Sequence, residues 1–349
     1  MSATPASGTR PARRTHFEAR LNYYSAQNVP LLLSLGILLG LILIYFLLFA
    51  VRQHRLPGNF ELSTTLNNTM TVGLTAIGQA LVVFTGGIDL SVGGIVDVTN
   101  SLAAVLMRNN PGSMLGVSLL VILVGAGAGL INGLFVTYGR LQPIIVTIAT
   151  LTIWQGVALL ILPQPGGAIP PPVTAILAGN IAPLAGLPSS VVILVLLLLL
   201  WQALRRTGFV VTLYAIGNDE RAAHANGAPV NLARIGAYTL GGAFSGAAGL
   251  YLAAVATSGD ATTGSQLTLT SIAAVVLGGI SLFGGRGSVV GALAGACILT
   301  LLLNVLFFAG VNPQLQEFFQ GLFLILAVVI STLIRRLLQS GRQVGGGSL

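Results

Sequence analysis

The sequence contains no lysine, and its 16 strongly basic side chains are all arginines. A Walker A phosphate loop needs a lysine that reaches the phosphates of the nucleotide. This chain therefore cannot carry that loop. The absence excludes ATP hydrolysis of the P-loop type by this chain alone.

Charged residues are also scarce, at 7% of the chain against 54% hydrophobic residues. A soluble domain usually carries about 25% charged residues, so this chain cannot cover a water-facing surface. Two long apolar runs, Leu31 to Val51 and Val191 to Trp201, would not be stable in water. The sequence therefore predicts an integral membrane protein.

Catalytic and metal-binding motifs are missing. The single cysteine, Cys297, excludes an internal disulfide and is best explained as a small buried side chain. The histidines (His16, His54 and His224) lie outside the apolar segments, and neither a His-Glu-x-x-His motif nor a Gly-x-Ser-x-Gly elbow occurs. We therefore expect no catalytic residue and no metal site.

Glycine, by contrast, is abundant, with 45 residues. A glycine costs about 1 kcal/mol relative to alanine in a soluble helix, but in lipid small residues allow helices to pack closely. Two glycine-rich passages, Gly86 to Gly94 and Gly278 to Gly285, are similar in sequence. Their similarity fits either an internal repeat, common in transporters, or chance in a glycine-rich chain.

The apolar segments predict an all-α membrane protein with about ten transmembrane helices, each needing about 20 residues to cross. The segments are 29–50, 62–84, 90–107, 114–138, 143–162, 189–204, 231–257, 265–283, 288–309 and 314–337. The third and sixth are short, which predicts broken or tilted helices. Between the fifth and sixth, Val173 to Leu187 is too short to cross and predicts an external loop or a re-entrant hairpin.

The arginines orient these helices. With ten crossings and a cytoplasmic N-terminus, three arginines lie outside, namely Arg52, Arg55 and Arg108. The others lie inside: Arg10, Arg13, Arg14, Arg20, Arg140, Arg205, Arg206, Arg221, Arg234, Arg286, Arg335, Arg336 and Arg342. The positive-inside rule expects such a bias, and changing the count by one removes it. We therefore predict that both termini are cytoplasmic.

The net charge of +8 is distributed over the ends of apolar segments, which indicates a bilayer as partner and no nucleic acid. The N-terminus lacks the cleavage site of a signal peptide, so the first helix is predicted to be retained. We assign residues 1–27 to a cytoplasmic segment, 28–338 to the transmembrane domain and 339–349 to a flexible tail.

Two carboxylates, Asp89 and Asp97, lie within apolar segments, where a charge costs about 2.5–3.5 kcal/mol at the helix centre. Glycines precede Asp89 and Ser91 follows it, which favours a chain break with Asp89 as the N-cap of the next helix over direct substrate binding. Asp97 faces either a polar cavity or a partner in the bundle.

Neutral polar residues also interrupt the apolar segments. With the two aspartates they form a candidate substrate passage: Asn67, Asn68, Gln79, Asp89, Asp97, Asn100, Asn132, Thr147, Thr150, Gln155, Thr268, Thr270 and Asn304. Each alone is better explained by hydrogen bonding between helices, worth about 0.6 kcal/mol on average. As a set they fit a neutral passage for a polyol equally well.

The longest polar break on the predicted cytoplasmic side is Arg205 to Pro229. Within it, Asn218 is placed to cap a short helix over 218–227, with two acidic residues in its first turn and Gly227 at its end. This segment is either an ordered loop or a helix that docks on a partner protein.

Four motifs occur in order along the chain. They are Thr85-Gly-Gly-Ile-Asp-Leu-Ser-Val-Gly93, Asn132-Gly133 followed by Leu141-Gln-Pro-Ile-Ile-Val-Thr-Ile-Ala-Thr150, Leu213-Tyr-Ala-Ile-Gly-Asn-Asp-Glu-Arg-Ala-Ala223, and Ile272-Ala-Ala-Val-Val-Leu-Gly-Gly-Ile-Ser-Leu282. From about Leu62 to Thr332 the chain thus resembles the permease subunits of bacterial ribose-type ABC importers. The third motif is similar to the family's cytoplasmic coupling helix. The resemblance implies these ATPase-coupling residues: Gly217, Asn218, Asp219, Glu220, Arg221, Ala222 and Ala223.

The resemblance also implies the ABC importer permease fold in the bacterial inner membrane. Its expected partners are a second permease, identical or not, ABC ATPase subunits that bind ATP and Mg, and a periplasmic sugar-binding protein. This chain is expected to bind no cofactor itself and to catalyse no reaction. The binding protein is expected to meet the extracellular ends, which include Arg52, Arg55, Glu61, Arg108 and Asp260.

Two departures concern the cargo. Thr268-Leu269-Thr270 stands where the family usually has Glu-Leu-Asp, and Gln155-Gly156 where Arg-Gly is usual. Both remove charge near the expected passage and leave open which pentose, hexose or related polyol is carried. The alternatives are an ABC permease for a nucleoside or a branched-chain amino acid, or an ion-coupled secondary transporter, against which the shortage of intramembrane acids argues.

Overall fold

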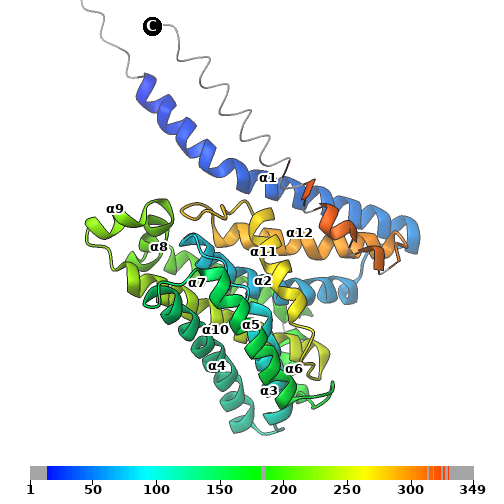
Figure 1. Cartoon of the computed structure of the whole chain (residues 1–349). Helices are drawn as coiled ribbons and strands as arrows, with labels where there is room; N and C mark the ends of the chain where they lie inside the picture. The colour runs from blue at the N-terminus through cyan, green and yellow to red at the C-terminus, as the bar shows by residue number, and fades with distance from the viewer. Residues whose placement is uncertain are drawn as a thin grey trace, which may run out of the picture.

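Helices make up nearly all of the computed structural model (Figure 1). It describes residues 14–181 and 186–312, together with 314–316, 318–323, 325–326 and 329, with side chains from residue 29 onward. The helices are α1 (Arg14–Gln53), α2 (Asn59–Phe84), α3 (Val92–Leu106), α4 (Pro111–Thr137), α5 (Pro143–Ile161), α6 (Pro171–Ala178), α7 (Ser189–Leu204), α8 (Gly208–Asn218), α9 (Glu220–Ala225), α10 (Val230–Ala256), α11 (Ser265–Leu277) and α12 (Val289–Phe308). Strands β1 (Asn180–Ile181) and β2 (Leu187–Pro188) pair antiparallel.

Nine of the ten predicted segments correspond to helices, and the tenth, 314–337, lies largely outside the described residues. Five helices (α1, α4, α5, α10 and α12) are long and apolar enough to cross a membrane, or six spans if the bent pair α7–α8 counts as one. The short stretch after the fifth segment forms α6 and the hairpin, too small to cross. The chain is therefore a helical, multi-pass membrane protein.

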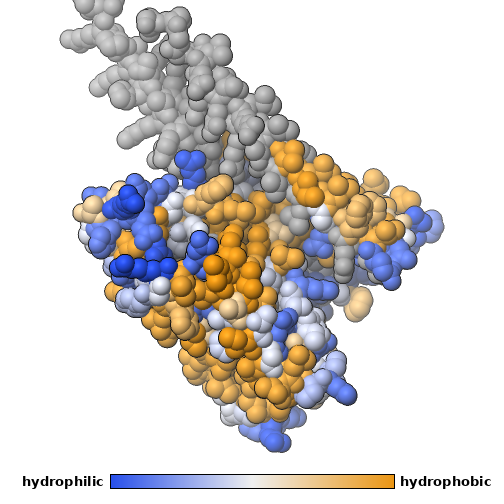
Figure 2. Space-filling view, in the orientation of Figure 1, coloured by the Kyte–Doolittle hydropathy of each residue, from blue (hydrophilic) through white to orange (hydrophobic). Residues whose placement is uncertain are grey.

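The outward faces of the long helices are apolar. Leu115 on α4 is 75% exposed and Leu160 on α5 is 84% exposed, and α1 and α7 also present leucines outward. Figure 2 shows this apolar surface across the middle of the molecule, with hydrophilic residues gathered at its extremities. Such a surface is stable in contact with lipid chains and not with water.

Helix α2 lies at the centre of the bundle and packs against α10, α11 and α12. From Met70 to its end almost every residue is buried. Because other helices surround it, α2 can carry threonine, glycine and amide side chains that a lipid-facing helix would not tolerate. This explains why a central helix is not among the most apolar.

Small residues bring α4 and α10 into backbone contact. A Cβ atom added to Gly129 on α4 would lie 2.1 Å from the carbonyl oxygen of Tyr238, and one added to Gly242 on α10 would lie 2.1 Å from that of Gly125. Gly125, Gly129 and Gly133 recur every fourth residue on one face of α4. This is the small-residue packing that membrane helices use in place of a hydrophobic driving force.

Two expected boundaries are wrong. The predicted segment 265–283 stops at Leu277, because Gly278 ends α11 and Gly279 has φ +77°, which L side chains rarely adopt. The polar break 205–229 contains a further helix, α8, whose axis is bent by 77° from that of α7. Its apolar face, with Val210, Leu213 and Ile216, is buried.

The two similar glycine-rich passages lie against each other. The Gly285 N–H donates to the carbonyl oxygen of Phe84 at 3.1 Å, and Gly284 lies beside Gly86. A Cβ atom on Gly217, near the end of α8, would lie 2.1 Å from the Phe84 oxygen and 2.2 Å from the Gly285 nitrogen. Three segments distant in sequence therefore meet with backbone packed directly against backbone.

Candidate functional site

The chain breaks between α2 and α3, where Gly86 has φ +81°. Asp89 lies in this break and is 1% exposed. Its Oδ1 accepts the backbone N–H of Ser91 at 2.8 Å and the Ser91 hydroxyl at 2.6 Å. The predicted break is confirmed, but Asp89 bonds the residue just before α3 rather than an N–H group of its first turn, because Ser91 itself occupies the N-cap position.

Polar residues from α2 itself and from three other helices, α4, α5 and α11, hold this break. The Asn132 amide donates to the Ser91 hydroxyl at 2.7 Å, and the Gly93 N–H donates to Thr268 Oγ1 at 3.1 Å. Thr147 Oγ1 lies 3.4 Å from the Ile88 carbonyl oxygen. The side-chain amide of Gln79 is oriented with its nitrogen toward the Asp89 carbonyl oxygen and its oxygen toward the Asp89 N–H. In this orientation Gln79 donates to the carbonyl oxygen at 2.8 Å. Each bond satisfies a backbone or hydroxyl group that would otherwise be buried without a partner.

A second polar group fixes the connection between α10 and α11. Asp97 Oδ1 accepts the Gly264 N–H at 2.6 Å, and Asn100 Oδ1 accepts the Asp260 N–H at 2.7 Å. Asp97 and Asn100 are both buried on α3. The sequence predicted that Asp97 faces either a polar cavity or a partner in the bundle. The structure shows a partner in the bundle, the Gly264 N–H.

A third group lies nearer the start of α2. Asn67 donates to the Ala178 carbonyl oxygen at 2.8 Å and accepts the Tyr251 hydroxyl at 2.9 Å. The Asn304 amide donates to Thr65 Oγ1 at 2.8 Å. These residues join α2 to α6, α10 and α12.

Four members of the predicted passage remain. Thr150 is buried and bonds back to the Val146 carbonyl oxygen in its own helix. Asn68 on α2 is exposed, and Gln155 on α5 and Thr270 on α11 are half-buried. The predicted set therefore divides into residues that hold the bundle together and a smaller group, Asn68, Gln155 and Thr270, that reaches its surface.

The predicted ATPase-coupling segment forms α9 and the end of α8. Asn218, Asp219, Glu220, Arg221 and Ala222 are exposed, whereas Ala223 is buried and Gly217 is packed on backbone atoms. The expected helix over 218–227 is shorter, because α9 spans Glu220–Ala225. Gly227, with φ +77°, follows its end as predicted.

The predicted cap of this helix is wrong by one residue. Asp219, not Asn218, is the N-cap: its backbone is extended, and its Oδ1 accepts the Ala222 N–H at 3.0 Å. Asn218 ends α8 and donates instead to the carbonyl oxygens of Tyr214 and Gly285.

An ion pair attaches α9 to α10. The Glu220 carboxylate lies 2.5 Å from the Arg234 guanidinium, and the side chain of Arg234 is 16% exposed against 53% for Glu220. The pair is therefore less screened by water on its α10 side than a fully exposed pair would be. It helps to fix the direction in which α9 projects.

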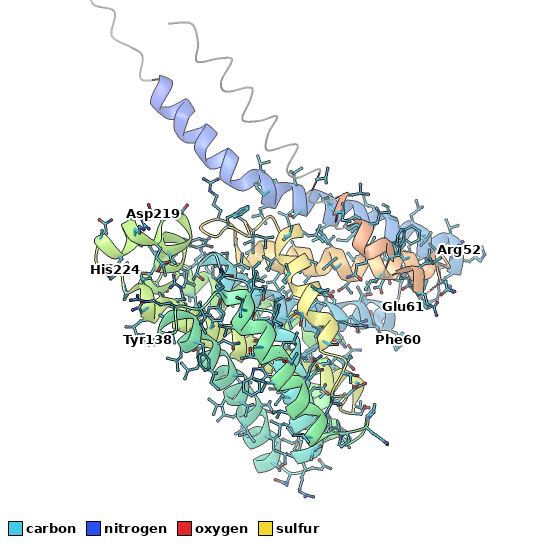
Figure 3. All side chains as sticks on the ribbon, in the orientation of Figure 1. Arg52, Phe60, Glu61, Tyr138, Asp219 and His224 are labelled. Atoms are coloured by element: carbon cyan, nitrogen blue, oxygen red, sulfur yellow. The ribbon has the colours of Figure 1, made fainter. Side chains whose placement is uncertain are left out.

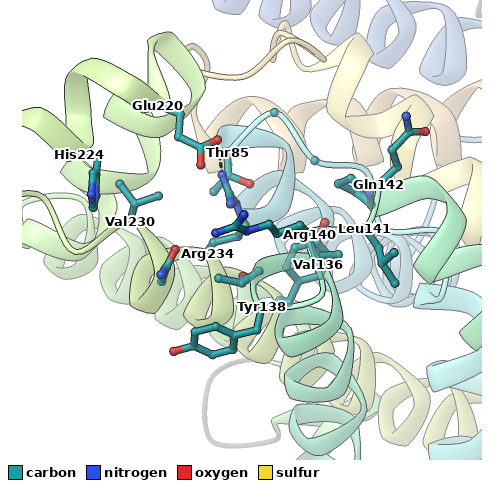
Figure 4. Close-up of a pocket in the computed structure, with 16 residues that line it drawn as sticks. Thr85, Val136, Tyr138, Arg140, Leu141, Gln142, Glu220, His224, Val230 and Arg234 are labelled. Carbon is teal, nitrogen blue, oxygen red and sulfur yellow. Dashed lines mark ion pairs between the residues drawn. The ribbon is translucent and has the colours of Figure 1, made fainter.

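A cavity of about 720 Å³ lies beside this ion pair (Figure 4). The ends of α4 and α5, the 85–87 turn, α9 and the start of α10 line it. Figure 4 shows Arg140, from the α4–α5 turn, and Arg234, from α10, both reaching its centre. The sequence did not single out this cavity, because its walls come from four separate segments.

The opposite end of the molecule carries the residues expected to face outward. Figure 3 shows Arg52, Phe60 and Glu61 at one extremity and Asp219, His224 and Tyr138 at the other. Arg55 and Glu61 form an ion pair. Near the far end of α10, the Thr262 hydroxyl and backbone N–H hold the pKa of Asp260 below its usual value, so this carboxylate is charged at neutral pH.

Metal coordination has no support among the side chains described in residues 29–181 and 186–312. In these ranges no three side chains of His, Cys, Asp or Glu are grouped as a metal site would require. Cys297 is half-buried on α12, as a small apolar-like side chain would be.

A family model described as the permease component of a branched-chain amino acid transport system matches residues 61–328. The chain belongs to this permease family. The permease is 34% identical over 308 residues to the ribose import permease protein RbsC of Bacillus subtilis, covering 85% of this chain and 92% of that protein. It is 37% identical to the fructose import permease protein FrcC of Rhizobium meliloti, covering 79% of each.

A third relative is the autoinducer 2 import system permease protein LsrC of Yersinia enterocolitica, 35% identical over 75% of the permease and 72% of that protein. No solved structure matches the permease. These relatives confirm the resemblance to ribose-type ABC import permeases. As a permease subunit, the chain serves transport and is not itself an enzyme.

Proposed function

We propose that this permease forms the membrane passage of a bacterial inner-membrane ABC importer for a monosaccharide, a pentose, hexose or related polyol. Relatives named as ribose and fructose import permeases, each at least 30% identical over most of the permease, support this cargo class. The proposed topology has ten crossings and cytoplasmic termini, since it places 13 of the arginines named above inside and three outside.

The observation that carries the proposal is the exposed, capped helix α9 at one polar end of the molecule. It buries little apolar surface of its own: of its six residues only Ala223 is buried. Its N-cap and its ion pair to Arg234 nevertheless fix its position. A short helix held rigidly and left exposed is suited to dock on a partner, here an ABC ATPase that would bind the ATP and Mg.

The passage is proposed to follow the outward faces of α2, α5 and α11, where Asn68, Gln155 and Thr270 reach the surface. Figure 2 shows less hydrophobic residues interrupting the apolar surface between α5 and α11. A second permease, identical or not, would cover this strip and close the passage. Neutral amides and hydroxyls there would exchange hydrogen bonds with a sugar without the desolvation cost of a charge.

The sugar-loaded binding protein is proposed to dock at the opposite, periplasmic end. Arg52, Arg55 and Arg108 are exposed there, and Glu61 and Asp260 are half-buried. Mixed charges on this end would steer and orient a partner more than they would add affinity.

The decisive experiment measures ATPase activity of the permease with its ATPase partner in lipid nanodiscs, with and without sugar-loaded binding protein. Glu220→Arg places two arginines together in the ion pair and displaces α9, so stimulation by the binding protein should be lost. Arg206→Ala, an exposed arginine of the same loop outside α9, is the matched control and should keep it. Equal stimulation in Glu220→Arg and the wild type would contradict the proposal.

Uptake assays separate the rival cargoes and mechanisms. Competition for the binding protein among ribose, fructose, a nucleoside and leucine should favour a sugar. Uptake should also persist when an ionophore removes the ion gradients. Uptake that collapses with the gradient, in a permease that binds no ATPase, would establish the secondary transporter instead.

A further inference from the structure

We propose that the cavity between α4, α5, α9 and α10 is a binding site for a phosphate group, carried either by a soluble phosphomonoester or by the headgroup of an anionic lipid. This site lies outside the proposed sugar passage. It adjoins the proposed ATPase-docking helix, because Glu220 and His224 of α9 line it.

The charge of the cavity favours an anion. Two guanidinium groups, those of Arg140 and Arg234, reach its centre from different elements (Figure 4). Glu220 pairs with Arg234, while Arg140 has no ion-pair partner among the residues that the structure describes. Two like charges brought together with a single carboxylate leave one positive charge to neutralise.

The other titratable groups that line the cavity do not remove its excess positive charge. His224 lines it and would add positive charge when protonated. Asp89 lies near Tyr238 but is not among the lining residues; its Oδ1 accepts two bonds from Ser91, and its buried Oδ2 makes no hydrogen bond within the described structure. The lining residues therefore include two arginines and one carboxylate.

Two buried hydroxyl groups in the lining have no partner. The hydroxyl of Tyr238, a fully buried residue, and Oγ1 of Thr137, which is 8% exposed, make no hydrogen bond within the described structure. Buried hydroxyls nearly always have a partner, and such exceptions point to an absent ligand or water. Both groups are able to donate to phosphate oxygens.

The backbone around the cavity also favours an anion. The first turns of α5 and α10 border the cavity through Pro143, Val230 and Asn231, and neither helix has a side-chain cap. Pro143 has no N–H, and the Val230 N–H donates to the Ala228 carbonyl oxygen at 2.8 Å. The partial positive charge of these two helix N-termini favours an anion in the cavity. They add to the positive potential of the two arginines, and the two hydroxyls beside them have no partner within the described structure.

The position of Arg140 has a conformational cost. Its φ is +52°, in the left-handed region that is unfavourable for a residue with a Cβ atom. Backbone strain of this kind persists where the surroundings require a particular side-chain direction, and it is concentrated at ligand sites. Here it accompanies the placement of a guanidinium over the cavity.

Both sources of the phosphate group fit the location. A cavity of about 720 Å³ is large enough for a sugar phosphate. Leu141 and Tyr138, exposed at its edge, continue the apolar surface of α4 and α5, from which a lipid headgroup could enter. Basic cavities at the cytoplasmic ends of membrane helices commonly bind anionic headgroups.

The test uses the full-length permease and two arms. In the first, delipidated protein is titrated calorimetrically with inorganic phosphate and with glycerol 1-phosphate. In the second, native mass spectrometry counts the phosphatidylglycerol molecules retained from nanodiscs of phosphatidylglycerol and phosphatidylcholine. We expect saturable binding of one phosphate group per chain in at least one arm, and the arm that shows it identifies the source.

Arg140→Asn removes the charge with a residue that tolerates positive φ, and should weaken this binding at least tenfold. Arg206→Asn, outside the cavity, should bind as the wild type does. If Arg140→Asn does not fold, Thr137→Val, which removes one hydroxyl at nearly constant volume, should weaken binding about threefold or more. No saturable binding in either arm, or wild-type affinity in the folded cavity variants, would overturn the proposal.

Discussion

Asp89 and Asp260 make the same local arrangement in different surroundings. Each carboxylate accepts the N–H and the hydroxyl of the residue two positions later: Ser91 for Asp89, at 2.8 and 2.6 Å, and Thr262 for Asp260, at 2.8 and 2.7 Å. Asp89 is buried at the centre of five helices, whereas Asp260 is half-buried in the connection between α10 and α11. Comparing these two aspartates therefore separates the effect of burial on stability from the effect of the turn itself.

We predict that Asp89→Ala lowers the free energy of unfolding by about 1–3 kcal/mol more than Asp260→Ala does. The first variant leaves the Ser91 N–H buried without an acceptor, whereas water replaces the lost acceptor in the second. Thermal unfolding of both variants in detergent measures the difference. Equal losses would show that the Asp89 site is hydrated and not sealed by the helices around it.

At this scale the sequence predicted the chain break at Asp89 but neither the bond to Ser91 nor the wider surroundings. A carboxylate between glycines and a serine indicates a turn by itself. By contrast, Asn132 reaches Ser91 across 41 residues and Thr268 reaches Gly93 across 175. No spacing in the sequence relates such partners, because the packing of α4 and α11 against α3 determines them.

Among the elements, α4 and α10 provide the sharpest test of packing. Gly129→Ala would place a Cβ atom 2.1 Å from the Tyr238 carbonyl oxygen and force the helices apart, whereas Gly127 on the same helix has nothing within 4 Å. We expect Gly129→Ala to destabilise the protein by at least about 1–3 kcal/mol, and Gly127→Ala to be nearly neutral. Thermal unfolding followed by size-exclusion chromatography compares the two, and similar stability would mean that α4 and α10 separate readily.

The cap of α9 gives a second prediction. Asp219→Ala should fray α9 by about 1 kcal/mol, seen as about fivefold faster amide exchange over residues 220–225. Asn218→Ala removes bonds to α8 and to Gly285 but not the cap, and should leave that exchange close to wild type. Hydrogen exchange by mass spectrometry measures both, and the reverse order would restore Asn218 as the cap.

The elements also show where sequence patterns stop being informative. Long apolar runs located α4, α5 and α12 to within three residues at each end. Asn218 and Asp219 are both good caps, so propensity alone did not choose between them. Helix α8 was missed within a polar break, although the spacing of Val210, Leu213 and Ile216 signals its buried face.

For the whole molecule, the two polar ends predict a labelling pattern. In a Cys297→Ser background, cysteine at Asn109 should react with a membrane-impermeant maleimide on intact spheroplasts. Cysteine at Ala225 should react only after lysis, because α9 is expected to be cytoplasmic. Both positions are exposed in the structure. The opposite pattern would invert the topology, and labelling of both from outside would change the number of crossings.

The meeting of Phe84, Gly217 and Gly285 has a mechanical consequence. Side-chain contacts have compliance, since rotamers shift and absorb small displacements, but here Gly217 places backbone directly against backbone, and the Asn218 amide bonds the Gly285 carbonyl oxygen beside it. The end of α8 is thus in stiff contact with the end of α2 and with the loop that leads into α12. A displacement of α9 is therefore expected to move the end of α2 and the loop before α12 with it.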